Sequence, residues 1–187
     1  ITPRAITLTA DSKTKVYKDA NPTLTYQIEQ ANGNRGLINN DIFTGNLATN
    51  ANSNSDIGNY DITSTLLNPN YNINYVPAQL NIINKNSTAQ ISIKTTEVTG
   101  IPVKLDGILS SELISQGAKI VVLDTSNKDV TELALQGKIQ PGKYSVKAVN
   151  DNINYSLTSN SVELTIKPAL DPTNLVKTQI QPILIEL

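Results

Sequence analysis

The sequence lacks four residue types entirely: cysteine, methionine, tryptophan and histidine. Without cysteine there is no disulfide, no thiol nucleophile and no thiolate metal site. Without histidine or cysteine, a Ser-His or Cys-His catalytic pair is excluded. The acidic residues are scattered over expected turns, whereas glycoside hydrolysis needs two carboxylates facing each other across a cleft. No glycine-rich phosphate loop is present either. The sequence therefore predicts that the chain is not an enzyme and uses no cofactor.

The chain also lacks a strong charge and a long apolar run. Its net charge is −1 at pH 7, which gives no long-range attraction to nucleic acid or to an anionic membrane. No stretch is long enough to span a bilayer. The sequence begins at Ile1, with no methionine and no signal peptide. We therefore expect an excised or processed segment of a longer protein that binds no nucleic acid and does not cross a membrane.

The residues that are present favour strands. Threonine, isoleucine, valine and tyrosine are abundant, and asparagine, glycine, proline and serine punctuate them. Ile6, Leu8 and Ala10 alternate with threonines, which is typical of a half-buried strand. Residues 119–123 (KIVVL) form the most apolar strand candidate. Helical turns are expected at 110–116, at 37–45 as an alternative to an irregular loop, and at 130–135 as an alternative to a strand.

One stretch occurs twice. Residues 58–82 return without a gap at residues 142–166, which is 84 positions later. The identical pairs are Gly58/Gly142, Tyr60/Tyr144, Asn68/Asn152, Asn70/Asn154, Tyr71/Tyr155, Leu80/Leu164 and Ile82/Ile166. Such a repeat is typical of modular arrays rather than of single-site enzymes.

The repeat divides the chain into three parts. We predict one β module at 1–84, a second at 85–168 and a C-terminal tail or strand at 169–187, with 84–87 as a short polar linker. The predicted fold class is mainly β: two tandem small modules, each a β-sandwich or β-grasp-like fold, immunoglobulin-like in general architecture. The tail ends in an apolar run at 183–187. It is interpreted either as a strand that pairs with the second module or begins the next element, or as an exposed edge strand or attachment segment.

The first module carries an ordered set of motifs. They are Ile1-Thr2-Pro3, Leu8-Thr9-Ala10, Lys15-Val16-Tyr17, Asp19, Asn21-Pro22, Leu24-Thr25-Tyr26 and the closing strands over 58–82. In this order and spacing they resemble the MBG domain of the YGX type, a repeated β-rich module of large bacterial surface proteins and adhesins. The family usually has glycine after the tyrosine of the KVY motif, where this chain has Lys18. A lysine there requires either a different turn or a strained backbone.

The second module keeps only the closing half of this pattern. It resembles either a diverged MBG unit or a different immunoglobulin-like module. The resemblance implies an extracellular segment of a filamentous adhesin at the bacterial cell surface. Its expected partners are neighbouring repeats, a host or cell-surface glycan or protein, or an anchoring or secretion partner. If the second module has a function of its own, we expect it within residues 91–141, where the repeat fails.

Three kinds of site are candidates. Tyr60, Tyr75 and Tyr144 either form an exposed aromatic ladder for a glycan or pack on the core with the hydroxyl at the rim. Asn52, Asn54 and Asp56 alternate like ligands of a calcium loop, but only one is charged, so the alternative is a plain Asn/Ser loop in an exposed polar stretch at 46–56. Asn86 and Asn154 begin glycosylation sequons.

Three functions therefore remain open. The first is a structural or adhesive segment of a secreted or surface-exposed bacterial adhesin, acting as a stalk repeat or in ligand contact, with a role in cell adhesion and biofilms. The second is a carbohydrate-binding accessory module of a secreted enzyme. The third is a C-terminal anchoring segment of an exported adhesin, in which 183–187 pairs with a partner.

Overall fold

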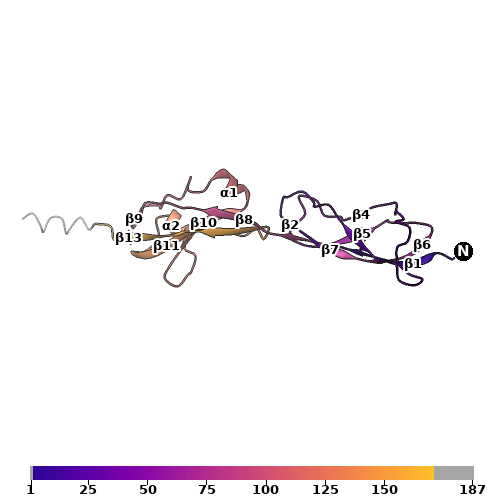
Figure 1. Ribbon diagram of the computed structural model, residues 1–187. Coiled ribbons are helices and arrows are strands. Elements are labelled where there is room, and N and C mark those ends of the chain that lie inside the picture. The colour runs from indigo at the N-terminus through magenta and orange to yellow at the C-terminus, as the bar shows by residue number, and fades with distance from the viewer. Residues whose placement is uncertain (1, 171–187) are drawn as a thin grey trace, which may run out of the picture. The chain divides into compact units, whose positions relative to one another are not determined.

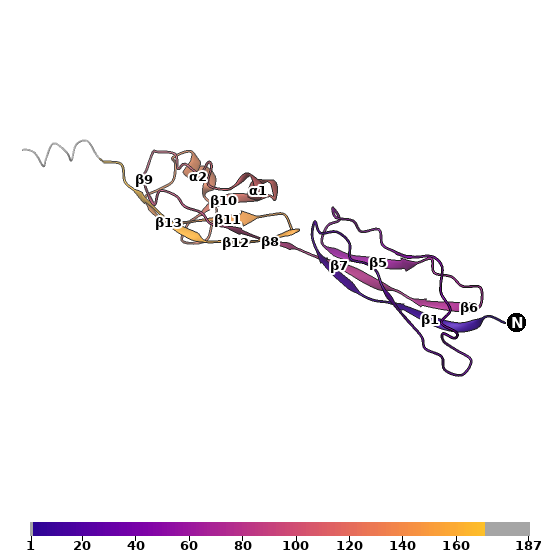
Figure 2. The same ribbon diagram turned by 45° about the horizontal axis from the view of Figure 1, so that its top comes forward.

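The computed structural model describes residues 2–170 and is mainly β, as predicted (Figures 1 and 2). The chain divides into two compact units. Within the described residues, the first comprises 2–86 together with 153–156, and the second comprises 87–152 and 157–170. The observed division after residue 86 lies two positions beyond the one expected after 84.

The first unit contains two sheets. Its strands are β1 (Arg4–Ala10), β2 (Lys13–Val16), β3 (Tyr26–Ile28), β4 (Leu47–Ala48), β5 (Gly58–Ser64), β6 (Tyr71–Val76) and β7 (Ala78–Ile83). One sheet has the order β3-β1-β6 and the other β2-β7-β5-β4. β1 and β6 pair in parallel in one sheet, and β2 and β7 pair in parallel in the other. The segments β1–β2 and β6–β7 therefore pass from the first sheet to the second next to each other. Pro77 separates β6 from β7, because proline has no N–H to donate to a strand ladder.

The second unit repeats the order of the four-stranded sheet. Its elements are β9 (Thr96–Val98), α1 (Ser111–Ser115), β10 (Ala118–Leu123), α2 (Thr131–Leu135), β11 (Gly142–Asn150) and β13 (Ser161–Lys167), together with most of β8 (Lys85–Ala89) and of β12 (Tyr155–Ser159). The four-stranded sheet runs β10-β11-β13-β9, and β12 pairs with β8. Here β9 lies parallel to β13, as β2 lies parallel to β7. This correspondence favours a diverged copy of the first module over an unrelated one.

The closing strands have the same register in both units. Gly58 pairs with Ile82 and Tyr60 with Leu80 in the first unit. In the second, Gly142 pairs with Ile166 and Tyr144 with Leu164. The repeat at an offset of 84 residues is therefore present in the three-dimensional structure as well as in the amino-acid sequence.

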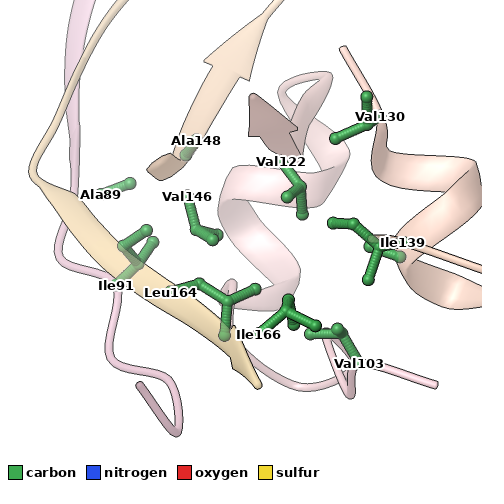
Figure 3. Packing of buried hydrophobic residues seen from close by; sticks show 11 residues of the cluster. Ala89, Ile91, Val103, Val122, Val130, Ile139, Val146, Ala148, Leu164 and Ile166 are labelled. Carbon is green, nitrogen blue, oxygen red and sulfur yellow. The ribbon is translucent and has the colours of Figure 1, made fainter. Parts of the chain in front are cut away.

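Each unit has its own buried apolar residues. In the first, Ile62, Leu80 and Ile82 form one cluster and Ile6, Leu8 and Tyr71 another. In the second, Val122, Val146 and Leu164 lie at the centre of a single larger cluster, whose side chains converge between the sheet and the surrounding loops (Figure 3). The alternation of apolar and polar residues along each strand places these side chains on one face.

Two local expectations are corrected, and one open alternative is decided. The expected polar linker at 84–87 largely belongs to the strand β8. Of the two alternatives for 130–135, a strand or a helical turn, the structure has the helix α2 over Thr131–Leu135. The stretch 46–56, expected to be exposed throughout, contains the short strand β4 and a buried Ala51. Its packing depends on contacts with distant residues, which local sequence does not reveal.

Acidic pH should lower the free energy of unfolding of the first unit. The guanidinium of Arg35 donates to Glu29, as does the backbone N–H of Thr7 at 2.7 Å, and together they lower the pKa of Glu29. Hydrogen bonds from Thr25 and Gln27 lower the pKa of Asp11 in the same way. A carboxyl whose pKa is lower in the folded state stabilises the fold above its unfolded pKa of about 4. This stabilisation is lost as the pH falls through the folded pKa.

We therefore expect the urea midpoint of the first unit to decline below about pH 4. Glu29→Gln should make that decline shallower, because it removes one of the titrating groups. A variant with an unchanged pH profile would contradict this assignment.

Candidate functional site

The three candidate tyrosines pack on the cores rather than standing free. Tyr60 and Tyr144 occupy equivalent positions, and both rings are half-buried against their own apolar clusters. Each hydroxyl donates to the carbonyl four residues earlier, Tyr60 to Asp56 and Tyr144 to Gln140, both at 2.9 Å. The rings face the cores because Tyr60 pairs with Leu80 and Tyr144 with Leu164, and paired residues share a face of the sheet.

Tyr75 is also engaged. It contacts both apolar clusters of the first unit, and its hydroxyl donates to the carbonyl of Ile62 at 2.7 Å. Burial raises the pKa of its phenol. Among the two interpretations of the tyrosines, the geometry supports packing with the hydroxyl at the rim.

A shallow polar hollow nevertheless lies beside each equivalent tyrosine. The hollow at Tyr60 has a volume of about 510 Å³ and is lined by Asn50, Asn59, Asp61 and Thr63. The hollow at Tyr144 has a volume of about 530 Å³, and its lining includes Ser161 and the ion pair of Lys143 with Glu163. Hydroxyl, amide and carboxylate groups at a surface can hydrogen-bond a polar ligand, and both hollows are lined by such residues, although the hollow at Tyr144 exposes more apolar surface.

The asparagine loop is held by protein groups. The carbonyl of Asn52 accepts from the ammonium of Lys15 at 2.7 Å, and the side-chain oxygen of Asn54 accepts from Lys18 at 3.0 Å. The carboxylate of Asp56 accepts from the side-chain amide of Asn154 at 2.8 Å. The ammonium groups of Lys15 and Lys18 are hydrogen-bonded to this loop, and their positive charge would repel a divalent cation there. Within residues 2–170, no three acidic side chains lie close enough together to form a metal site. The geometry supports the Asn/Ser loop interpretation.

The two sequons differ in accessibility. Asn86 is exposed on β8. Asn154 is 6% exposed, and its amide nitrogen, to which a glycan is attached, donates to Asp56. A glycan at Asn154 is therefore incompatible with the folded arrangement, and the glycosylation hypothesis stays with Asn86.

At the residue after the KVY motif, Lys18, the sequence left open either a different turn or a strained backbone. The φ angle of Lys18 is 74°, so the backbone keeps the left-handed conformation that suits glycine, and the lysine accepts the strain. Its ammonium group lies 4.9 Å from the centre of the Tyr17 ring and donates to Asn54, which compensates in part.

Lys18→Gly is accordingly expected to raise the free energy of unfolding of the first unit by about 0.5–1 kcal/mol, since relief of the strain outweighs the lost exposed contacts. Lys18→Ala is the matched control, because it loses the contacts but keeps the strain, and it should destabilise by about 0.5 kcal/mol. Urea unfolding of the three proteins measures both effects. Equal destabilisation by glycine and alanine would show that the strain is unimportant.

Sequence reasoning missed one surface, in the region where the repeat fails. Exposed apolar side chains gather around α1, α2 and the outer strand β10, among them Ile114, Leu133 and Leu135. Figure 2 shows both short helices on the β10 side of the unit. The sequence could have indicated this surface. SSELISQ and VTELAL each carry apolar residues next to or near one another, and a single helical turn cannot bury all of them on one face.

The family comparison agrees with the motifs of the first unit. Residues 6–81 match the family model of the MBG domain (YGX type), which confirms the resemblance predicted for this part of the chain. No curated protein matches the chain. Within residues 2–170, no helix is long and apolar enough to cross a membrane.

Proposed function

With residues 6–81 similar to a surface-protein repeat module, we propose that the chain is a structural segment of a large bacterial surface protein, exposed outside the cell. In this role it acts as a stalk repeat with adhesive surfaces on its loops and carries out no catalysis. The observation that carries this proposal is the repeat itself. The two units use the same strand order in their four-stranded sheets and the same register in their closing strands. Duplicated modules of this kind build length by repetition.

Surface labelling tests this role. Antibodies raised against the chain should label intact cells that produce the parent protein, and brief protease treatment of those cells should remove the label. Labelling that appears only after lysis would overturn the proposed location and, with it, the stalk role.

The polar hollows beside Tyr60 and Tyr144 favour a second candidate, carbohydrate binding. Under this hypothesis a glycan array gives a defined set of sugar signals with the chain. Lys143→Ala combined with Glu163→Gln should abolish the signals that depend on the second unit, while Lys94→Ala, which breaks an exposed ion pair elsewhere, should leave them unchanged. An array without any signal would remove this candidate.

The anchoring hypothesis concerns residues 183–187, which lie outside the described residues. Deletion of 175–187 from the parent protein tests it directly. Release of the protein into the medium is the expected result, and unchanged retention on the cell would remove the hypothesis.

A further inference from the structure

The outer strand of the second unit, β10, has an edge that is only half covered. Near its end, the N–H of Val130 donates to the carbonyl of Val122 at 2.8 Å, and the N–H of Val122 donates to Thr131 at 2.9 Å. Ile120 lies two residues earlier, so its N–H and C=O face the same edge. Within residues 2–170, neither group has a hydrogen-bond partner on that edge. The N–H and C=O of Ile120 are therefore open for pairing.

An apolar hollow adjoins this open edge. Its volume is about 250 Å³, and Leu105, Leu109, Ile114 and Leu135 line it together with the start of β10. Ile114 is 58% exposed and Leu135 is 39% exposed. Leu105 and Leu109 also pack against the core, whereas Ile114 and Leu135 lie outside the core cluster and leave apolar surface exposed.

A second hollow on the same edge is acidic. Its volume is about 420 Å³, and its lining includes Asp129, Glu132 and Leu133 beside Lys119 and Val121. The ammonium of Lys119 is already paired with Asp151 at 2.6 Å. Glu132 is exposed and makes no ion pair within the described chain. This hollow therefore suits a basic side chain.

The two hollows share Lys119, Ile120 and Thr131, so they adjoin along the strand. Ile120 faces the core, whereas Val121 faces the opposite side of the sheet. A strand added at the edge would direct successive side chains to alternate faces. We propose that this edge binds an extended peptide segment of a partner protein by strand addition, with an apolar side chain in the first hollow and a lysine or arginine beside Glu132 in the second.

Peptide binding tests this inference and does not depend on the stalk role. The probe is a blocked seven-residue peptide of alternating valine and lysine, titrated into the full chain and followed by NMR. At saturation, hydrogen exchange of the Ile120 amide should slow by at least about tenfold, because a free edge amide becomes hydrogen-bonded. A peptide of alternating valine and glutamate serves as the charge control and should not bind.

Variants locate the binding surface. Glu132→Lys and Ile114→Lys should each weaken binding by about tenfold, which corresponds to about 1.4 kcal/mol. Asp19→Lys and Ile101→Lys are the matched controls, because they change an exposed acid and an exposed apolar residue outside both hollows, and they should leave binding unchanged.

Three results would overturn the inference. The first is no change at the Ile120 amide on addition of the valine-lysine peptide. The second is an Ile120 amide that is protected in the full chain and becomes exposed after truncation at Leu170, because the edge would then be occupied by the chain's own residues. The third is protection that rises with protein concentration together with a dimer in sedimentation, because the occupant would then be a second copy.

Discussion

Leu80→Ala and Leu164→Ala should each lower the free energy of unfolding of their own unit by about 2–5 kcal/mol. The two leucines are equivalent in the repeat, and both are completely buried. Each pairs with the corresponding tyrosine on the neighbouring strand. Removing either side chain leaves a cavity at the centre of an apolar cluster, and the two clusters have no residue in common.

Hydrogen exchange in increasing urea, followed by mass spectrometry, measures each unit separately. Peptides from β5 and β7 report on the first unit, and peptides from β11 and β13 on the second. Leu67→Ala and Leu170→Ala are the controls, since both side chains are largely exposed and should cost less than about 0.5 kcal/mol. A large effect of Leu80→Ala combined with a negligible one of Leu164→Ala would show that the second unit does not use the same core position.

Lys15→Met should destabilise the first unit by about 2–4 kcal/mol. Lys15 is 6% exposed, and its ammonium donates to the carbonyl of Asp19 at 3.0 Å and to that of Asn52 at 2.7 Å. Methionine has a similar shape but cannot donate, so both partly buried carbonyls would lose a charged hydrogen bond. The lysine thereby connects β2 to the asparagine loop, which lies far away in sequence.

The control is Lys13→Met, on the same strand, because no hydrogen bond from the Lys13 ammonium is present in the described structure. Its expected cost is below about 0.5 kcal/mol. Hydrogen exchange should also quicken in residues 49–57 of Lys15→Met but not of Lys13→Met. If the two variants were equally stable, the loop would not depend on Lys15.

Features that depend on neighbouring residues could be predicted from the sequence, whereas features that depend on contacts between distant residues could not. Alternation and the 84-residue offset predicted the closing strands, because a strand's faces depend only on neighbouring residues. The break at Pro77 and the helical turn at 110–116, observed as α1, also have local causes. The strand order of the second unit was not accessible, since its opening half shares no motif with the first.

The candidate sites show the same limit. The letters NSNSD resemble a calcium loop, but nothing local indicates that Lys15 and Lys18 supply the positive charge there. Likewise, the sequence does not show which face of the sheet Tyr60 and Tyr144 occupy, and only their register with Leu80 and Leu164 shows that it is the core face. The open edge of β10 depends on which strand lies outermost, and sheet order cannot be read from periodicity.

Two β modules with the same closing strands follow each other in the chain, and the proposed stalk role requires each of them to be a separate folding unit. Single-molecule extension of the chain between its ends tests this most directly. We predict two separate unfolding events, each releasing roughly 80 residues, or about 260–290 Å of extended chain. A single event releasing both units at once, or one unit that extends without a force peak, would contradict the account.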